Sequence, residues 1–258
     1  MDYLVKVRGV HFVDAVKLLT ENIPLSNNHD NNSIKAIPPP KSKAPPKPFV
    51  LPKANKNTDR VTAYLRGRGI SNEIINRCIK AGVIYESIAH RCIFVGKDGD
   101  TPKFAFERGT SDDWKKDVAG SNKQFSFTLP PTNPSSQNLV VTESAVDCLA
   151  HLTIHEIGQT GFDGHRLSLS GVSSTALYGF LERNPQINNI RLSLDNDIVG
   201  KEATNRIIKE LFNDKRFSNV KITVAPAPLG KDYSDTIQAI HQLNMKQHKL
   251  DRSHEAAF

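Results

Sequence analysis

The sequence lacks the features that define several classes of protein. Its 258 residues include only three cysteines, Cys78, Cys92 and Cys148, and no Cys-x-x-Cys pair. They can build neither a disulfide framework nor a zinc ribbon, so we expect reduced, mostly buried thiols and no bound zinc. No apolar run approaches the roughly 18 residues of a membrane helix, and the first residues lack the order of a secretion signal. We therefore expect a cytoplasmic protein with no membrane partner.

Charge is distributed unevenly along the chain. The formal net charge is +7. Lys and Arg number ten against five Asp and Glu in residues 1–60, eleven against eight in 61–136, and thirteen against fourteen in 137–258. The basic excess therefore lies in the N-terminal half, which favours a polyanionic partner for that half.

The N-terminal half divides into three parts. Residues 1–23 predict a strand or turn followed by a short amphipathic helix. Residues 24–57 are rich in Pro, Lys and Asn and predict an extended linker; a proline-rich docking site or a basic nucleic-acid arm is the alternative. Residues 58–130 predict a small α+β domain, with two helices over 59–66 and 71–80 and strands over 83–85, 91–95, 103–107 and 124–129.

The C-terminal half alternates strands with helices. This order predicts an α/β domain over 137–246, with a parallel sheet that has helices on both faces. We expect the tail, 247–258, to be disordered. The expected strands are 139–142, 167–170, 190–194 and 220–225, and the expected helices are 144–157, 174–182, 200–212 and 233–245.

Three carboxylates follow two of these strands. Glu143 comes directly after the first strand, and Asp195 and Asp197 come after the third. In an open parallel sheet the ligand site lies beyond the carboxyl ends of the strands, so the three side chains meet if the two strands are neighbours. Glu143 alone could simply cap a helix. Two aspartates two residues apart are better explained by a cation between them, and oxygen ligands suit Mg²⁺ or Mn²⁺.

Two sequence segments carry a resemblance to a known family. Leu139-Val-Val-Thr-Glu-Ser-Ala-Val-Asp147 and Leu192-Ser-Leu-Asp-Asn-Asp-Ile-Val-Gly200 resemble the Toprim domain of bacterial primases, topoisomerases and some nucleases. Its signature is a glutamate after the first strand and Asp-x-Asp after a later one. Gly171 is similar to the glycine that ends the strand between them, and Gly230-Lys-Asp-Tyr-Ser-Asp235 to a turn near the end of primase Toprim domains. The resemblance implies a Rossmann-like Toprim domain.

The same resemblance implies roles for individual residues. Asp195 and Asp197 would be metal ligands, and Glu143 a third ligand or the general base of a phosphoryl transfer. Lys231 would contact a phosphate, although an exposed turn lysine is often only solvated. Asp147, Gly171 and Asp232 would support the site; for Asp147 the alternative is a solvated helix face.

Residues 60–127 are similar to the small domain that precedes Toprim in primase-like proteins of plasmids and other mobile elements. On that resemblance Arg108 and Lys123 would contact nucleic acid or a nucleoside triphosphate. Trp114, Phe125 and Phe127 could stack on bases, but aromatic residues at strand spacing are more often part of a core. Residues 2–16 resemble the segment that follows the zinc ribbon of primases, so either Met1 is not the true start or the ribbon has been lost.

Three side chains of one expected helix could bind a different metal. His151 and His155 lie four residues apart and follow Asp147 at the same spacing, which could bind zinc. The simpler expectation is that these polar groups form the solvent-facing side of the helix.

These observations together favour a primase-like protein of a mobile element. It would use Mg²⁺ or Mn²⁺ for nucleotidyl transfer on single-stranded DNA, with nucleoside triphosphates as substrates and a helicase, relaxase or replication protein as a candidate partner. A Toprim nuclease and a catalytically weak nucleic-acid-binding accessory protein remain open alternatives. A topoisomerase is disfavoured because the chain has no room for strand-gate domains.

Overall fold

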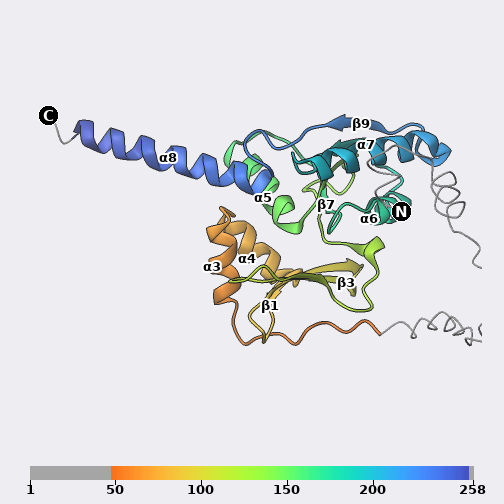
Figure 1. The fold of residues 1–258 in the computed structure, drawn as a ribbon, viewed down its shortest axis with the longest axis horizontal. Helices are drawn as coiled ribbons and strands as arrows, with labels where there is room; N and C mark the ends of the chain where they lie inside the picture. The colour runs from red at the N-terminus through yellow and green to blue at the C-terminus, as the bar shows by residue number, and fades with distance from the viewer. Residues whose placement is uncertain (1–47, 256–258) are drawn as a thin grey trace, which may run out of the picture. The chain divides into compact units, whose positions relative to one another are not determined.

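The computed structural model describes the backbone of residues 48–255 and the side chains of residues 48–247 (Figure 1). The expected N-terminal segment 1–23 and most of the expected linker 24–57 lie outside these residues. The described end of that linker differs from the expectation. Phe49 and Leu51 pack against buried residues of a sheet, and Ala54 forms an isolated antiparallel bridge with Ser87. Burial of these apolar side chains fixes the segment, so the folded part begins before residue 58.

The small domain contains two helices and an antiparallel sheet. Helix α3 spans Asp59–Gly67 and α4 spans Asn72–Lys80. Ser71 caps α4 by accepting a hydrogen bond from the Ile74 backbone N–H at 3.4 Å, as the sequence predicts. The four strands lie in the order β1-β2-β3-β4, with bounds β1 Ile84–Glu86, β2 Cys92–Asp98, β3 Thr101–Arg108 and β4 Lys115–Asp117.

The second sheet has five strands in the order β5-β7-β6-β8-β9. Four of them, β7, β6, β8 and β9, are parallel, and β5 pairs antiparallel with β7 at the edge. The bounds are β5 Thr128–Leu129, β6 Asn138–Thr142, β7 His165–Ser168, β8 Asn189–Leu192 and β9 Lys221–Val224; the helices are α5 Ala145–Ile157, α6 Thr175–Arg183, α7 Ile198–Asn213 and α8 Tyr233–Glu255. This arrangement confirms the predicted α/β class with an α+β region before it.

One expected strand belongs to the other sheet. The pattern of residues 124–129 predicts a strand of the small domain. The structure has instead a short 3₁₀ helix, Lys123–Phe125, followed by β5, which pairs with β7. The 3₁₀ helix packs tightly on the small sheet: a Cβ on Gly96 of β2 would lie 1.6 Å from the Phe125 carbonyl oxygen. The chain therefore crosses between the two sheets before residue 130.

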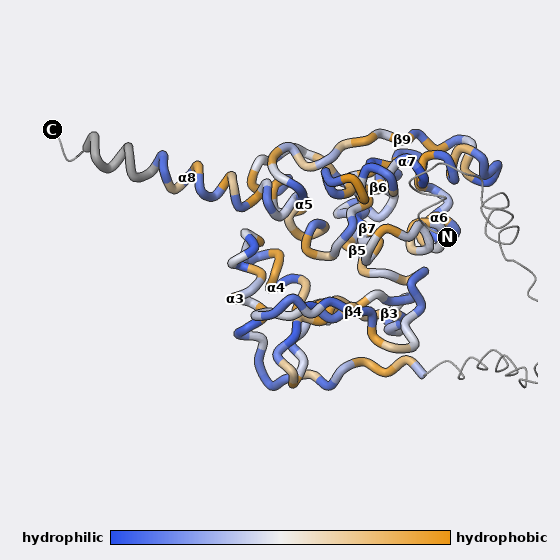
Figure 2. The backbone as a smooth tube through the Cα atoms, in the orientation of Figure 1, coloured by the Kyte–Doolittle hydropathy of each residue, from blue (hydrophilic) through white to orange (hydrophobic). Residues whose placement is uncertain are grey.

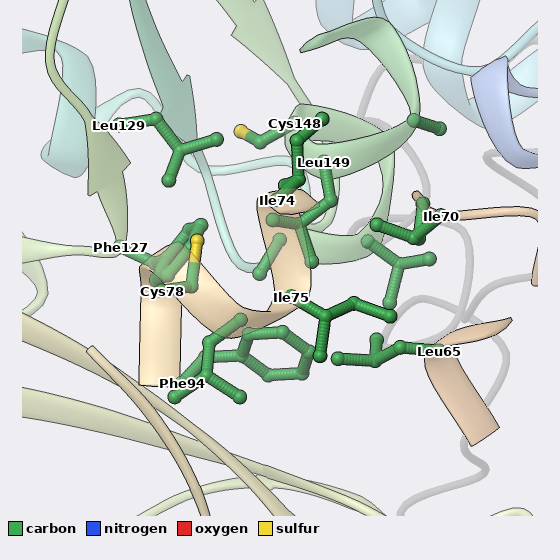
Figure 3. Packing of buried hydrophobic residues seen from close by; sticks show 14 of the residues in the cluster. Leu65, Ile70, Ile74, Ile75, Cys78, Phe94, Phe127, Leu129, Cys148 and Leu149 are labelled. Carbon is green, nitrogen blue, oxygen red and sulfur yellow. The ribbon is translucent and has the colours of Figure 1, made fainter. Parts of the chain in front are cut away.

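The two halves share one hydrophobic core. Figure 3 shows Cys148 and Leu149 of α5 packed beside Ile74 and Ile75 of α4, and Phe94 of β2 closes the same cluster. Residues 145–151 of α5 are all buried, because the helix has the small domain on one side and the five-stranded sheet on the other. The far side of that sheet has a second core, formed with α6 and α7.

Helix α8 is longer than the sequence pattern indicates. Ile237 in its first turns is fully buried, whereas Leu243 and Met245 are exposed, and hydrophobic and hydrophilic positions alternate along it (Figure 2). The helix continues to Glu255, so most of the tail expected to be disordered has helical backbone. No Gly or Pro interrupts residues 233–255, which permits this continuation. None of the described helices is both long and apolar enough to cross a membrane.

Candidate metal and phosphate site

The site begins where the central strand β6 ends. Strand β6 lies between β7 and β8, so the ends of the first and third Toprim-type strands are neighbours, which is the condition for their carboxylates to meet. Glu143 follows β6 directly and is only partly exposed. Ser144 caps α5 by accepting a hydrogen bond from the Asp147 N–H at 3.2 Å. This cap sets the first turn of α5 beside the sheet edge.

The Asp-x-Asp segment follows β8 and is held by backbone contacts. Asp197 caps α7: its carboxylate accepts a hydrogen bond from the Gly200 N–H at 2.8 Å, and this contact, followed by Lys231, lowers the pKa of Asp197. The Asn196 amide donates to the Ala227 carbonyl at 3.1 Å. A Cβ on Gly200 would lie 2.1 Å from the Asp195 carbonyl oxygen. Only glycine permits this close approach of α7 to the segment.

Lys231 lies between the two aspartates. Its ammonium is 3.1 Å from the Asp195 carboxylate and 3.0 Å from that of Asp197, and these contacts raise the pKa of Lys231. The turn that carries it is fixed by the Asp235 carboxylate, which accepts a hydrogen bond from the Lys231 N–H at 2.9 Å. A positive charge therefore already occupies the position between the carboxylates.

Three aspartates at this edge could hold a metal ion. One carboxylate oxygen from each of Asp147, Asp195 and Asp232 lies within 4.8 Å of the others. Only Asp195 belongs also to the ligand set that the motifs predict; Glu143 and Asp197 are adjacent to this group rather than in it. Asp147 is 4% exposed, which corrects the alternative of a solvated helix face.

Burial raises two acidic pKa values at the site. The pKa of Glu143 rises to about 7 through burial and then the charges of Asp195 and Asp197. That of Asp147 also rises to about 7, through burial and then Asp232. The buried Oε1 of Glu143 has no hydrogen-bond partner among the described residues. Like charges and an unpaired buried oxygen both indicate that a cation would stabilise this edge, so the donor set fits Mg²⁺ or Mn²⁺.

Basic side chains line the same cavity as these acids. A cavity of about 470 Å³ is lined on the acidic side by Glu143, Asp147, Asp195 and Asp232. Its other wall comes from the small domain and includes Arg68, Arg108 and Lys115. The structure thus brings Arg108, Lys231, Gly171 and the carboxylates together. Gly171 has a φ of +121°, a left-handed value that favours glycine.

The motif analysis missed Arg68 as a site residue. Its Nε is buried and has no hydrogen-bond partner within the described residues, although the residue lines the cavity. The available signal was its place in the Gly-Arg-Gly turn between α3 and α4. That turn lacks phosphate-loop spacing, so no motif marks it as a phosphate site.

Lys123 and the aromatic residues lie elsewhere. Lys123 donates to the Ser170 carbonyl at 2.9 Å and pairs with Asp117 at 3.1 Å, so it connects the two halves and does not line the cavity. Phe127 is fully buried, and Trp114 is covered by the Arg91 guanidinium, 3.7 Å from the ring. Arg183 similarly covers Phe125 at 4.0 Å.

The two histidines of α5 are not on a solvent face. His151 is fully buried, and its ring packs against those of His155, Phe162 and Tyr233. Burial lowers the pKa of His151 to about 2. The expectation of a solvated face was wrong because α5 is enclosed by the small domain, α8 and the loop before β7, which a helical periodicity cannot reveal.

Comparison with known families gives one match for each half. Residues 140–237 match the Toprim-like family model, which confirms the Toprim domain predicted from the motifs. The chain therefore carries a Toprim-like domain. Residues 63–133 match a family described as a protein of unknown function (DUF3991). No curated protein matches the chain.

Several solved structures are similar in part. The primase fragment of the bacteriophage T7 primase-helicase protein is 20% identical, with 70% of this chain and 71% of that chain covered and a TM-score of 0.49. The Aquifex aeolicus primase, with zinc-binding and RNA polymerase domains, is 13% identical, with 74% and 55% covered and a TM-score of 0.46. The RNA polymerase domain of Mycobacterium tuberculosis primase is 16% identical, with 75% and 65% covered and a TM-score of 0.37.

Proposed function

We propose that this protein is a primase-like enzyme that performs metal-dependent nucleotidyl transfer on single-stranded DNA. The observation that carries the proposal is the cavity lined by Toprim carboxylates on one side and by small-domain cations on the other. Carboxylates suit a divalent cation, and guanidinium groups suit phosphate. A substrate that requires both is a metal-bound phosphate of a nucleotide or nucleic acid.

The acidic side has the ligands for the ion. Asp195, with Asp147 and Asp232 or with Glu143 and Asp197, would hold Mg²⁺ or Mn²⁺. When bound, the ion would offset the negative charge that develops on the phosphate oxygens during transfer. An ion held by Asp195 and Asp197 would displace Lys231 from the position between them, and its ammonium would then be available to a phosphate oxygen.

The basic side would position the substrate. Arg68 and Arg108 lie where a triphosphate or a template phosphate would meet the ion, and the unpartnered Nε of Arg68 is a donor available for such an oxygen. Bidentate guanidinium contacts fix the orientation of a phosphate as well as its charge. This division assigns binding to the small domain and chemistry to the Toprim domain.

The proposed transfer step forms one bond to phosphorus and breaks another. The oxygen of a 3′-hydroxyl forms a bond to the α-phosphorus of a nucleoside triphosphate, the bond from that phosphorus to the β-phosphate oxygen breaks, and diphosphate leaves. The hydroxyl proton passes to a base, for which Glu143 is the candidate, because its carboxylate lines the cavity and its buried Oε1 has no hydrogen-bond partner among the described residues. In the nuclease reaction, water would instead attack the phosphorus of a phosphodiester in the strand, the bond from that phosphorus to a sugar oxygen would break, and the sugar hydroxyl would leave after taking up a proton.

One assay separates these functions. Labelled ribonucleotides, a single-stranded template and Mn²⁺ or Mg²⁺ are incubated with the wild type, with Glu143→Gln and with Asp195→Asn. Asp113→Asn, at an exposed aspartate outside the cavity, is the matched control. Primers made by the wild type and the control but by neither site variant support the proposal. A shortened template supports the nuclease, and template binding without any product supports an accessory protein.

The biological setting is part of the same proposal. We propose that the protein acts in the cytoplasm, in the replication or transfer of a mobile element such as a plasmid, with a helicase, relaxase or another replication protein as partner. The net charge of +7 and the cationic cavity wall support a nucleic-acid partner.

A further inference from the structure

A second cavity lies away from the acidic one. It has a volume of about 550 Å³ and lies between α4, the segment after β5, α5 and the loop before β7. None of its lining residues lines the acidic cavity. Most of the wall is apolar, with Val83, Leu129 and Leu152 among its members. This size and lining are typical of a site for a small organic molecule.

A buried cation lies in the wall of this cavity. Arg166 of β7 is 2% exposed. Its Nε donates to Nδ1 of His151 at 3.1 Å, and its Nη1 donates to the Gly164 carbonyl at 3.0 Å. Both acceptors are uncharged, since burial keeps His151 neutral. Burial also lowers the pKa of Arg166, which reflects the cost of a buried charge.

The acidic groups near Arg166 already have other partners. Glu156 pairs with Arg77 at 2.6 Å. The Asp163 carboxylate accepts hydrogen bonds from the backbone N–H groups of Thr132 and Asn133 at 2.7 and 2.8 Å. Within residues 48–247 no carboxylate forms an ion pair with Arg166. An anionic ligand at this guanidinium would offset the cost of the buried charge.

The remaining wall has aromatic faces. The Phe162 and His155 rings are 5.1 Å apart, and the Arg166 guanidinium lies 5.5 Å from the Phe162 ring. A planar ring placed against Phe162 would therefore reach the guanidinium with a substituent only a few bonds long. Aromatic pairs prefer separations of about 4.5–7 Å, which the cavity volume accommodates.

We propose that this cavity binds a small aromatic anion, with its ring against Phe162 and His155 and its carboxylate or phosphate on Arg166. The site does not depend on the proposed enzymatic function, because it shares no residue with the acidic cavity. Carboxylate and phosphate ligands present the same chemistry to a guanidinium, and the probes below distinguish them.

The test uses matched probes that differ in charge. Indole-3-acetate, the neutral indole-3-acetamide and the cationic tryptamine form one series; adenosine monophosphate and adenosine form the second. Affinities are measured by ligand-observed NMR titration on the full chain at millimolar probe concentrations. We expect the anion of at least one series to bind about tenfold or more tightly than its neutral counterpart, since a charge-assisted hydrogen bond has about that effect.

Two variants locate the binding. Arg166→Met removes the charge, and Ala81→Trp fills the cavity from an exposed lining position, so it tests the site even if the buried substitution prevents folding. Arg183→Met is the matched control, because that arginine also covers an aromatic ring but lies outside the cavity. We expect anion binding to fall about tenfold in Arg166→Met, to be lost in Ala81→Trp, and to persist in the control. Equal affinity for anion and neutral probe, no binding of any probe, or unchanged binding in Ala81→Trp would overturn the proposal.

Discussion

Lys231 provides the sharpest test of the acidic site, because it competes with a divalent cation for the same oxygens. Its ammonium lies 3.1 Å from Asp195 and 3.0 Å from Asp197. A metal ion held between Asp195 and Asp197 would displace it. Replacing the lysine by methionine keeps the length of the side chain and removes the charge.

The magnitude of the effect follows from the exposure of the contacts. The Lys231 side chain is 53% exposed, and exposed ion pairs contribute about 0.2–1 kcal/mol each. Losing both should lower the free energy of unfolding without metal by about 1 kcal/mol. Removing one positive charge beside the ligands should favour the cation by about 1–2 kcal/mol after solvent screening, which corresponds to roughly tenfold tighter binding.

The assay is calorimetric titration with Mn²⁺, accompanied by thermal unfolding with and without Mg²⁺. Lys231→Arg keeps the charge and should remain near the wild type. Lys221→Met, at an exposed residue on the first position of β9, should change neither quantity. If Lys231→Met bound Mn²⁺ as weakly as the wild type or more weakly, then Lys231 would not be competing for the metal ligands, and the reasoning would fail.

Three other substitutions test separate parts of the site. The folded-state pKa of Glu143, about 7, lies above its ordinary value of 4.5, so its ionisation destabilises the metal-free fold as the pH rises through this interval. In urea unfolding with chelator, the free energy of unfolding of Glu143→Gln should therefore rise by about 1–2 kcal/mol relative to that of the wild type between about pH 5 and pH 8. A difference between the two proteins that does not vary with pH would contradict this. Arg68→Met should weaken nucleotide or single-stranded DNA binding about 10- to 100-fold in fluorescence titrations. Arg66→Met, at an exposed residue of α3, should have little effect; equal losses of affinity would mean that both arginines act only by nonspecific attraction. Gly200→Ala should lower stability by about 1–3 kcal/mol in the same unfolding assay and weaken Mn²⁺ binding, because its Cβ would lie 2.1 Å from a carbonyl oxygen of the Asp-x-Asp segment. Gly67→Ala, where no atom lies within 4 Å, should not be destabilised, and a matching loss there would mean that the close contact is not the cause.

The parallel sheet could be predicted well from the sequence because its signals are local. Each buried strand is a short apolar run, and each helix has a cap or an apolar face, so the expected bounds of β6 and α7 differ from the structure by few residues. The place of the carboxylates also followed from a general rule, since residues at the carboxyl ends of parallel strands share one edge. The rule predicts that Glu143 and Asp195 lie together, and both line the same cavity.

The errors have a common physical cause, which is packing between segments distant in the chain. Asp147 and His151 look like the polar face of a helix, but α5 is enclosed on several sides. The pattern of residues 124–129 predicts a strand of the small sheet, yet residues 128–129 pair with β7. Arg68 belongs to no recognisable motif. It lines the cavity because the turn after α3 lies opposite the carboxylates at the edge of the parallel sheet. Periodicity in one segment contains no information about the segment that covers it.

The composition of the acidic cavity shows why the two halves form a single functional unit. The Toprim-like half supplies the carboxylates, and the half of the DUF3991 match supplies Arg68, Arg108 and Lys115. The same halves share the core around α5, and β5, which lies in the first half, pairs with β7 of the second. Separating them would expose apolar surface of α5 and would leave the carboxylates without the cations on the other wall. One wall of the cavity is therefore acidic and the other basic, and a phosphate with a bound cation would complement both walls.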